Sequence, residues 1–179
     1  MIKPQLEQLL FEEHSRRQAD FIVEIIKQQP LLLISLLEII KLEEEPISRR
    51  AAWPLKILFE NAPEIVNPYL DQITSDLKII KTPAILRSFL SIIAHSEIKD
   101  SWYGFLLQYS SETILDINSE IAVKANCLDI FFQIAQTEVE LFHELEQMIE
   151  HIYPESSRGI QNKCRNILKG IEKIRLNNP

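Results

Sequence analysis

Apolar residues recur along almost the whole chain with the 3.6-residue period of an amphipathic helix. Convincing alternation of apolar and polar residues, which is typical of half-buried strands, is absent. The breaks are short and carry helix-start chemistry. Thr82-Pro83 predicts an N-cap followed by a proline in the first turn, and Thr137 with Glu140 predicts a capping box. The pattern therefore predicts an all-α protein of about ten helices.

The chain also repeats itself. The segment Ser15-Arg16-Arg17-Gln18-Ala19 recurs as Ser48-Arg49-Arg50-Ala51-Ala52. With Ala52 as the anchor, five helices carry an apolar or small residue at the anchor, three residues later and seven residues later, which predicts one buried stripe on each helix. These positions are Ala19, Ala52, Leu86, Cys127 and Cys164; Ile22, Leu55, Phe89, Ile130 and Ile167; and Ile26, Phe59, Ile93, Ile134 and Ile171.

Each of these five helices follows another amphipathic segment. The preceding segments lie near residues 4–13, 31–42, 64–79, 102–115 and 139–152. A single helical hairpin cannot bury its apolar face, whereas stacked hairpins share a continuous core. The sequence therefore predicts five helical hairpins in a single helical-repeat domain over residues 1–179.

One repeat carries a recognisable order of features. A leucine-rich first helix begins at Pro30-Leu31-Leu32-Leu33, an acidic turn follows at Glu43-Glu44-Glu45-Pro46, and the second helix opens with Ser48-Arg49-Arg50-Ala51-Ala52-Trp53. In this order the chain resembles HEAT-like repeats of the armadillo-type superhelical class, although the third repeat has Pro83-Ala84 where the family pattern has arginine. The resemblance implies a right-handed α-α superhelix whose second helices line a concave partner groove. It implies packing and no particular reaction.

Composition narrows the function classes. The chain has 19 basic and 26 acidic residues, a net charge of −7, which disfavours nucleic acid, and its three glycines disfavour a glycine-rich phosphate loop. Cys127 and Cys164 lie in helical patterns and predict buried, reduced thiols. The most apolar run, residues 30–40, is far shorter than the ~20 residues that cross a bilayer, and no signal-peptide pattern is present. We expect a soluble cytoplasmic protein that does not enter a membrane.

Metal and catalytic motifs are weak. Glu140-x-x-His143 has the spacing of one half of a di-metal carboxylate site, but the second copy that this chemistry needs is not evident. No His-Glu-x-x-His, paired Cys-x-x-Cys or Gly-x-Ser-x-Gly arrangement occurs. The sequence predicts no metal, no cofactor and no catalytic residue.

The candidate partner-binding residues lie on or beside the outward face of the second helices. The Arg pairs at 16–17 and 49–50 can receive an acidic segment, or they can form a structural ladder with glutamates one turn earlier. Trp53 beside Pro54 can shape a pocket or simply pack in the core. The set is Arg17, Phe21, Arg50, Trp53, Ile57, His95 and Phe132.

The leading functional hypothesis is a non-enzymatic protein-interaction module that binds an acidic or acidic-hydrophobic segment, with a homodimer as a further option. A rival is a DNA-repair enzyme that resembles the HEAT-like alkylpurine glycosylases, for which Asp129 would be the candidate acid. The basic residues 156–179 would then form an arm for nucleic acid, or they pack on the acidic residues 112–155. A helical lyase is the weakest alternative, because its Gly-Ser-Ser-x-Met-Pro-type loop is missing.

Overall fold

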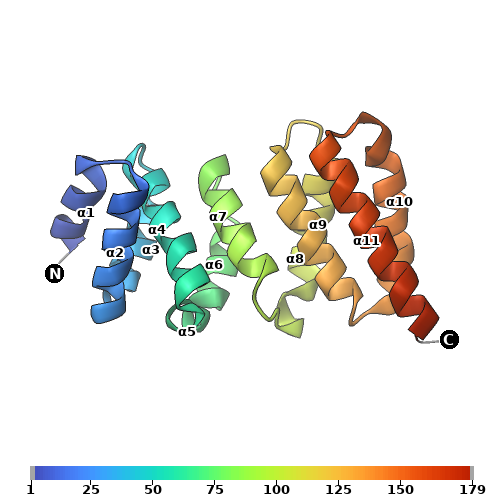
Figure 1. The fold of residues 1–179 in the computed structure, drawn as a ribbon, viewed down its shortest axis with the longest axis horizontal. Helices are drawn as coiled ribbons and strands as arrows, with labels where there is room; N and C mark the ends of the chain where they lie inside the picture. Colours follow the sequence, from blue (N-terminus) through green and yellow to red (C-terminus); the bar gives the residue numbers. More distant parts are fainter. Residues whose placement is uncertain (1–2, 178–179) are drawn as a thin grey trace. The chain divides into compact units, whose positions relative to one another are not determined.

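The computed structural model describes residues 3–177 and shows a chain of α-helices and short 3-10 turns (Figure 1). No strand occurs in the described range, which confirms the all-α prediction. The chain divides into two compact units, with unit 1 ending at Ser96 and unit 2 beginning at Glu97. The expectation of a single repeat domain over residues 1–179 stays a prediction.

Unit 1 contains the first three predicted hairpins. Helices α2, α4 and α7 form one layer, and α1, α3 and α6 lie behind them (Figure 1). The elements are α1 (Lys3–Glu12), α2 (Arg16–Gln28), α3 (Leu32–Lys41), α4 (Ile47–Asn61), α5 (Pro63–Val66), the 3-10 turn η1 (Asn67–Tyr69), α6 (Leu70–Asp76) and α7 (Pro83–Ala94).

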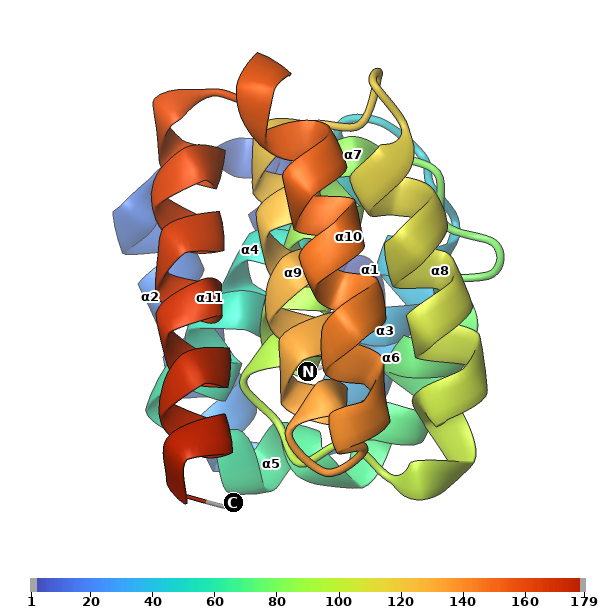
Figure 2. The same ribbon diagram turned by 90° about the vertical axis from the view of Figure 1, so that its right-hand side faces the viewer.

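Unit 2 contains the last two hairpins. Helix α8 packs on α9, α10 contacts both, and α11 lies against α9 and α10 (Figure 2). The elements are the 3-10 turn η2 (Asp100–Trp102), α8 (Tyr103–Leu115), α9 (Ile121–Ala135), η3 (Val139–Leu141), α10 (Phe142–Ile152), η4 (Tyr153–Glu155) and α11 (Arg158–Asn177).

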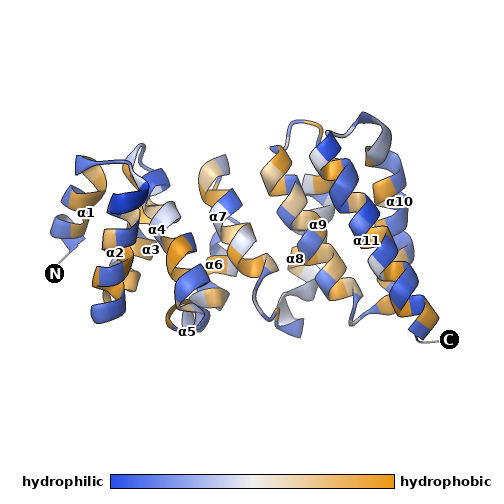
Figure 3. Ribbon diagram, viewed as in Figure 1, coloured by the Kyte–Doolittle hydropathy of each residue, from blue (hydrophilic) through white to orange (hydrophobic). Residues whose placement is uncertain are grey.

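The predicted stripe forms the core of both units. Of its fifteen positions, fourteen are buried, and only Leu86 is half-buried. Figure 3 shows the same pattern as apolar and polar positions that alternate around α2 and α11. At roughly 25 cal/mol per Å² of buried apolar surface, this stripe stabilises each unit together with buried residues of the first helices such as Leu36 and Leu145. The helical register inferred from the sequence is therefore confirmed.

Local helix signals were less reliable than the stripe. The predicted helix over residues 64–79 is broken at Asn67-Pro68 into α5, η1 and α6, because Pro68 has no N–H to donate to the carbonyl of Glu64. The capping box at Thr137 is wrong: Thr137 Oγ1 donates to the Ile134 carbonyl at 2.8 Å, and α10 begins only at Phe142.

The acidic turn fastens the second repeat to the third. Glu43 adopts a left-handed backbone with φ of 53° and accepts hydrogen bonds from the backbone N–H groups of Lys81 at 2.7 Å and Thr82 at 2.6 Å. Burial alone would raise the pKa of the Glu43 carboxyl, but the bonds from Thr82 and Lys81 lower it below its ordinary value. Thr82 precedes α7 as predicted, yet its side chain forms no cap and the Glu43 carboxylate serves the start of that helix instead.

Candidate binding surface

Two neighbouring pockets lie between α4 and α7 in unit 1, and both are lined by Lys56. The Trp53 pocket has a volume of about 420 Å³ and the His95 pocket about 470 Å³. The Trp53 pocket is lined by His14, Arg49, Trp53, Lys56, Ala84, Arg87 and Ser88, and the His95 pocket by Lys56, Phe59, Glu60, Pro63, Ser91 and His95.

The Trp53 pocket combines cations with an aromatic wall. The Trp53 and His14 rings meet edge to face with centroids 5.3 Å apart. Arg49 pairs with Glu45 at 3.1 Å and Lys56 with Glu60 at 3.5 Å, but both are exposed pairs within one helical turn and contribute under about 1 kcal/mol. No acidic side chain is among the described residues that line this pocket. The surface is therefore suited to an anionic group.

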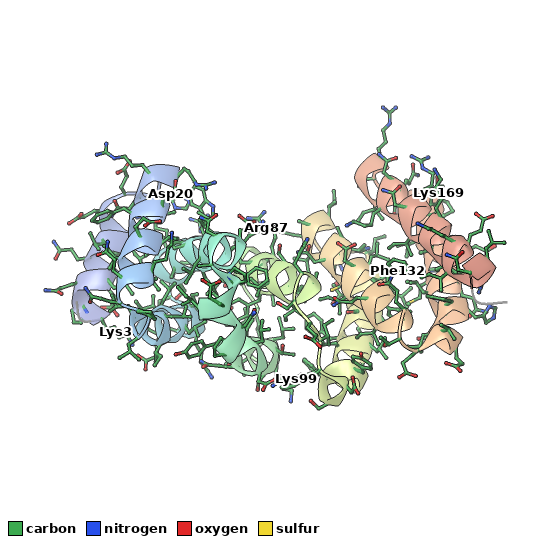
Figure 4. All side chains as sticks on the ribbon, turned by 60° about the horizontal axis from the view of Figure 1, so that its bottom comes forward. Lys3, Asp20, Arg87, Lys99, Phe132 and Lys169 are labelled. Carbon is green, nitrogen blue, oxygen red and sulfur yellow. The ribbon has the colours of Figure 1, made fainter. Side chains whose placement is uncertain are left out.

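The Arg pairs take different roles. Arg49 binds Glu45 one turn earlier at 3.1 Å, as the predicted ladder has it, whereas Arg16 binds Asp20 one turn later through two contacts of 2.8 and 3.0 Å. Arg17 is exposed and forms no ion pair with a described residue. Figure 4 shows Asp20 and Arg87 on one side of unit 1 and Lys3 on the opposite side.

Arg50 corrects the sequence interpretation. Its guanidinium donates to the carbonyl oxygens of Leu10 at 3.2 Å and Phe11 at 2.9 Å, which belong to the last turn of α1. Carbonyls in the last turn of a helix lack intrahelical partners, so a cation there stabilises the helix end. Arg50 therefore links α4 to the end of α1 through these hydrogen bonds, which is a structural contact.

Phe21 and Ile57 were both predicted on the outward face. Phe21 is 51% exposed on α2, as predicted. Ile57 is only 2% exposed, so its predicted exposure is wrong. Helix α4 contacts α1, α2, α3, α5 and α7, and neighbours on several sides cover positions that a single-helix projection places in solvent.

His95 and Phe132 end in different environments. His95 is exposed, lines the His95 pocket and donates from Nδ1 to the Ser91 carbonyl at 2.7 Å. Phe132 packs beneath α11, so close that a Cβ on Gly170 would stand 2.7 Å from its ring (Figure 4). Phe132 therefore contacts α11 while it stays half-exposed, and its place in a partner groove stays a prediction.

The basic final helix pairs two of its cations with acidic side chains of its own unit. Lys163 binds the Asp129 carboxylate at 2.8 and 2.5 Å, and Arg175 binds Glu146 at 2.6 and 2.9 Å. The interpretation that α11 packs on the acidic helices is confirmed at these two contacts. The Asp129 carboxylate, which the glycosylase alternative would need, is held by Lys163.

Unit 2 also exposes an apolar patch after α8. Leu115, Ile117 and Ile121 are exposed there and border a pocket of about 380 Å³. Its lining mixes Lys124 and Glu155 with several serines, so no single charge sign dominates. This patch differs in chemistry from the Trp53 pocket.

The two thiols of unit 2 are buried, and His143 contacts a neighbouring side chain. Cys127 and Cys164 are free and buried, and burial raises the pKa of Cys127 to about 12 and also raises that of Cys164. His143 Nε2 lies 3.1 Å from the Gln147 side-chain amide. Within residues 3–177 no three His, Cys, Asp or Glu side chains gather closely enough to hold a metal ion.

Sequence reasoning missed several pocket residues, above all Lys56 and Arg87. A signal for Arg87 existed, because it follows Leu86 by one residue as Trp53 follows Ala52. Equivalent positions of successive repeats lie side by side, so the register of the stripe places Arg87 next to Trp53.

No helix within residues 3–177 combines the length and the apolar character needed to cross a membrane. The paired helices, buried along one repeated stripe, define a helical-repeat protein with a basic pocket between two second helices. The HEAT repeat domain family matches residues 6–171, and the chain belongs to that family. Comparisons with curated proteins and with solved structures found no match.

Proposed function

We propose that this HEAT repeat chain is a non-enzymatic scaffold that binds a protein partner along the second helices of unit 1, α2, α4 and α7. HEAT repeats commonly mediate protein interactions, which supports the class of function. The pair of pockets between α4 and α7 is the observation that supports this location of the binding surface. On α2, which belongs to the same layer of helices, Arg17 and Phe21 are exposed. They add one charged and one apolar group to the proposed surface.

The distribution of charge supports an acidic partner. Unit 1 as a whole has eleven basic and thirteen acidic residues, yet α2, α4 and α7 hold seven basic and only three acidic residues. A surface of one charge sign steers a partner of the opposite sign during encounter, while apolar groups hold the complex. We propose Arg17, Phe21, Trp53 and His95 as contact residues from the original set, with Lys56 and Arg87 added.

Nucleic acid is the second candidate, and it is less well supported. The net charge of −7 opposes a phosphate backbone, and Lys163 and Arg175 of the basic helix are engaged within unit 2. Retention of the protein on heparin with a steep salt dependence would favour this alternative.

A homodimer is a third option, and sedimentation at several protein concentrations distinguishes it.

The cellular compartment is also a proposal. The two free, buried thiols of α9 and α11 support a reducing compartment such as the cytoplasm.

Site-specific photo-crosslinking tests the proposed surface. A photoreactive phenylalanine replaces Phe21 on α2, and a matched variant carries it at Ile34 on α3, which is 42% exposed in the other layer of unit 1. We expect a protein to crosslink at position 21 and not at position 34 in the cells that produce the chain. Crosslinking at position 34 alone, or at neither position, would contradict the proposed surface.

A further inference from the structure

We propose that the groove formed by the Trp53 and His95 pockets binds an acidic peptide segment. This proposal rests on the proposed function and specifies its partner. A carboxylate side chain of the partner enters the Trp53 pocket, and an apolar side chain of the same segment enters the His95 pocket.

The Trp53 pocket supplies the carboxylate site. Arg49, Lys56 and Arg87 bring three cationic side chains to one cavity. Guanidinium groups match carboxylate oxygens with paired hydrogen bonds. The glutamates that now pair with Arg49 and Lys56 are bound by exposed contacts, so a ligand carboxylate competes with them at little cost. The Trp53 ring forms one wall, and an apolar wall strengthens an ion pair by displacing water.

The His95 pocket supplies the apolar site. Phe59 and Pro63 form walls without charge, Ser91 on α7 and His95 directly after it lie on the other side, and Lys56 and Glu60, which pair with each other, complete the lining. The Nδ1 proton of His95 is already bound to the Ser91 carbonyl, so this side of the imidazole does not demand a polar ligand. Phe59 is only 9% exposed, whereas Pro63 is exposed, so an apolar side chain that covers Pro63 gains the free energy of removing both surfaces from water.

The spacing of the pockets defines the segment. On α7 the Trp53 pocket is lined by residues 84, 87 and 88 and the His95 pocket by residues 91 and 95. The midpoints of these two groups lie about seven residues apart, roughly 10 Å at 1.5 Å per helical residue. An extended chain covers about 3.3 Å per residue, so the acidic and apolar side chains of the partner stand about three residues apart.

A peptide library tests the chemistry directly. The full chain is incubated with an immobilised library of random ten-residue peptides, and bound peptides are sequenced. We expect enrichment of Asp or Glu with Leu, Ile, Met or Phe about three residues away. Fluorescence anisotropy then compares an enriched peptide with versions that carry Gln for the acid or Ala for the apolar residue, each of which should bind about tenfold more weakly.

Protein variants place the binding in the groove. Arg87→Glu and Lys56→Glu should each weaken the peptide about tenfold or more. Arg158→Glu makes the same charge change in unit 2 and should leave binding unchanged. Circular dichroism checks folding, and Arg87→Gln serves if the Glu variant does not fold.

Four results would overturn the inference: no enrichment of acidic peptides, preference for a phosphoserine peptide, preference for a single-stranded oligonucleotide, or binding that survives both groove variants. A protein that crosslinks at position 21 regardless of Arg87→Glu would leave the proposed function standing while this inference fails. Self-association that depends on Arg87 would instead assign the groove to a second copy of the chain.

Discussion

The two units bury the same repeated stripe but differ in where the acidic partners of their cations lie: Arg49 and Lys56 of unit 1 pair with glutamates one helical turn away, whereas Lys163 and Arg175 of unit 2 pair with other helices. In unit 1 the cations of α4 and α7 line an accessible pocket. In unit 2 the cations Lys163 and Arg175 are bound to acidic side chains of α9 and α10, and Phe132 lies beneath α11. The same repeat architecture therefore leaves a pocket between the second helices α4 and α7 and brings the second helices α9 and α11 into close contact.

The units also differ in how adjacent repeats are joined. In unit 1, Arg50 and Glu43 bind backbone groups at the ends of α1 and α7. In unit 2, the second helices α9 and α11 meet through the ion pair of Lys163 with Asp129 and through the close approach of Gly170 to Phe132. In unit 1, polar side chains therefore bind the backbone at helix ends. In unit 2, side chains meet side chains or a glycine along the length of two helices.

The largest expected effect is a cavity in one unit. Leu55 is fully buried in α4, and Leu55→Ala should lower the free energy of unfolding by about 2–5 kcal/mol through lost burial and a cavity. Denaturant unfolding measures the loss, and hydrogen exchange locates it, with faster exchange expected in residues 3–96. Ile130→Ala is the matched change in unit 2 and should reverse this distribution. Equal acceleration of exchange in both units by either variant would show that they do not open separately.

The close contact of α9 and α11 predicts the next effect. Gly170→Ala places a Cβ 2.7 Å from the tip of the Phe132 ring, so the ring must shift, and overpacking should offset the roughly 1 kcal/mol that Ala gains over Gly in a helix. Gly159→Ala on the same helix meets only Ser157 Oγ at 3.8 Å, so it should be neutral or slightly stabilising. In a Phe132→Leu background, Gly170→Ala should shift the free energy of unfolding in a more favourable direction than in the wild type. A double-mutant cycle based on thermal unfolding measures this difference. Equal effects in both backgrounds would exclude this contact as the cause.

Glu43 predicts a smaller effect that depends on pH. Glu43→Gln removes the charge that accepts two backbone N–H groups and should cost about 1 kcal/mol near pH 7. Because the folded pKa of Glu43 is lowered, its contribution is present above the ordinary value of 4.5 and is lost as pH falls through the lowered pKa. Urea unfolding should therefore show a larger difference at pH 7 than at pH 3. The exposed neighbour provides the control, since Glu44→Gln should change stability at neither pH.

The smallest expected signal is the rate at which a thiol reagent labels the cysteines of the folded protein. Cys127 is buried with a pKa raised to about 12, so at pH 8 only about one molecule in ten thousand carries the thiolate. An aromatic disulfide reagent should react only after unit 2 opens, because both cysteines lie there. Leu55→Ala should leave this labelling rate unchanged, whereas Ile130→Ala should raise it. Rapid labelling of the folded wild-type protein would disprove the burial.

The sequence predicted the fold closely because burial follows the helical period. The register at Leu55 and Ile130 needs no knowledge of neighbouring helices. Ile57 could not be placed, because its burial depends on which helices surround α4. Arg17 and Arg50 occupy equivalent positions in one motif, yet only Arg50 was found at the end of a preceding helix, which is a property of tertiary structure.

One indole falls in each unit, Trp53 in unit 1 and Trp102 in unit 2. Replacement of Trp102 by Phe would leave a single emitter in the wall of the Trp53 pocket. Its emission wavelength would then shift when an occupant displaces water from the indole. The pocket thus contains its own optical reporter, and titration of the unlabelled protein would read occupancy at the level of one side chain.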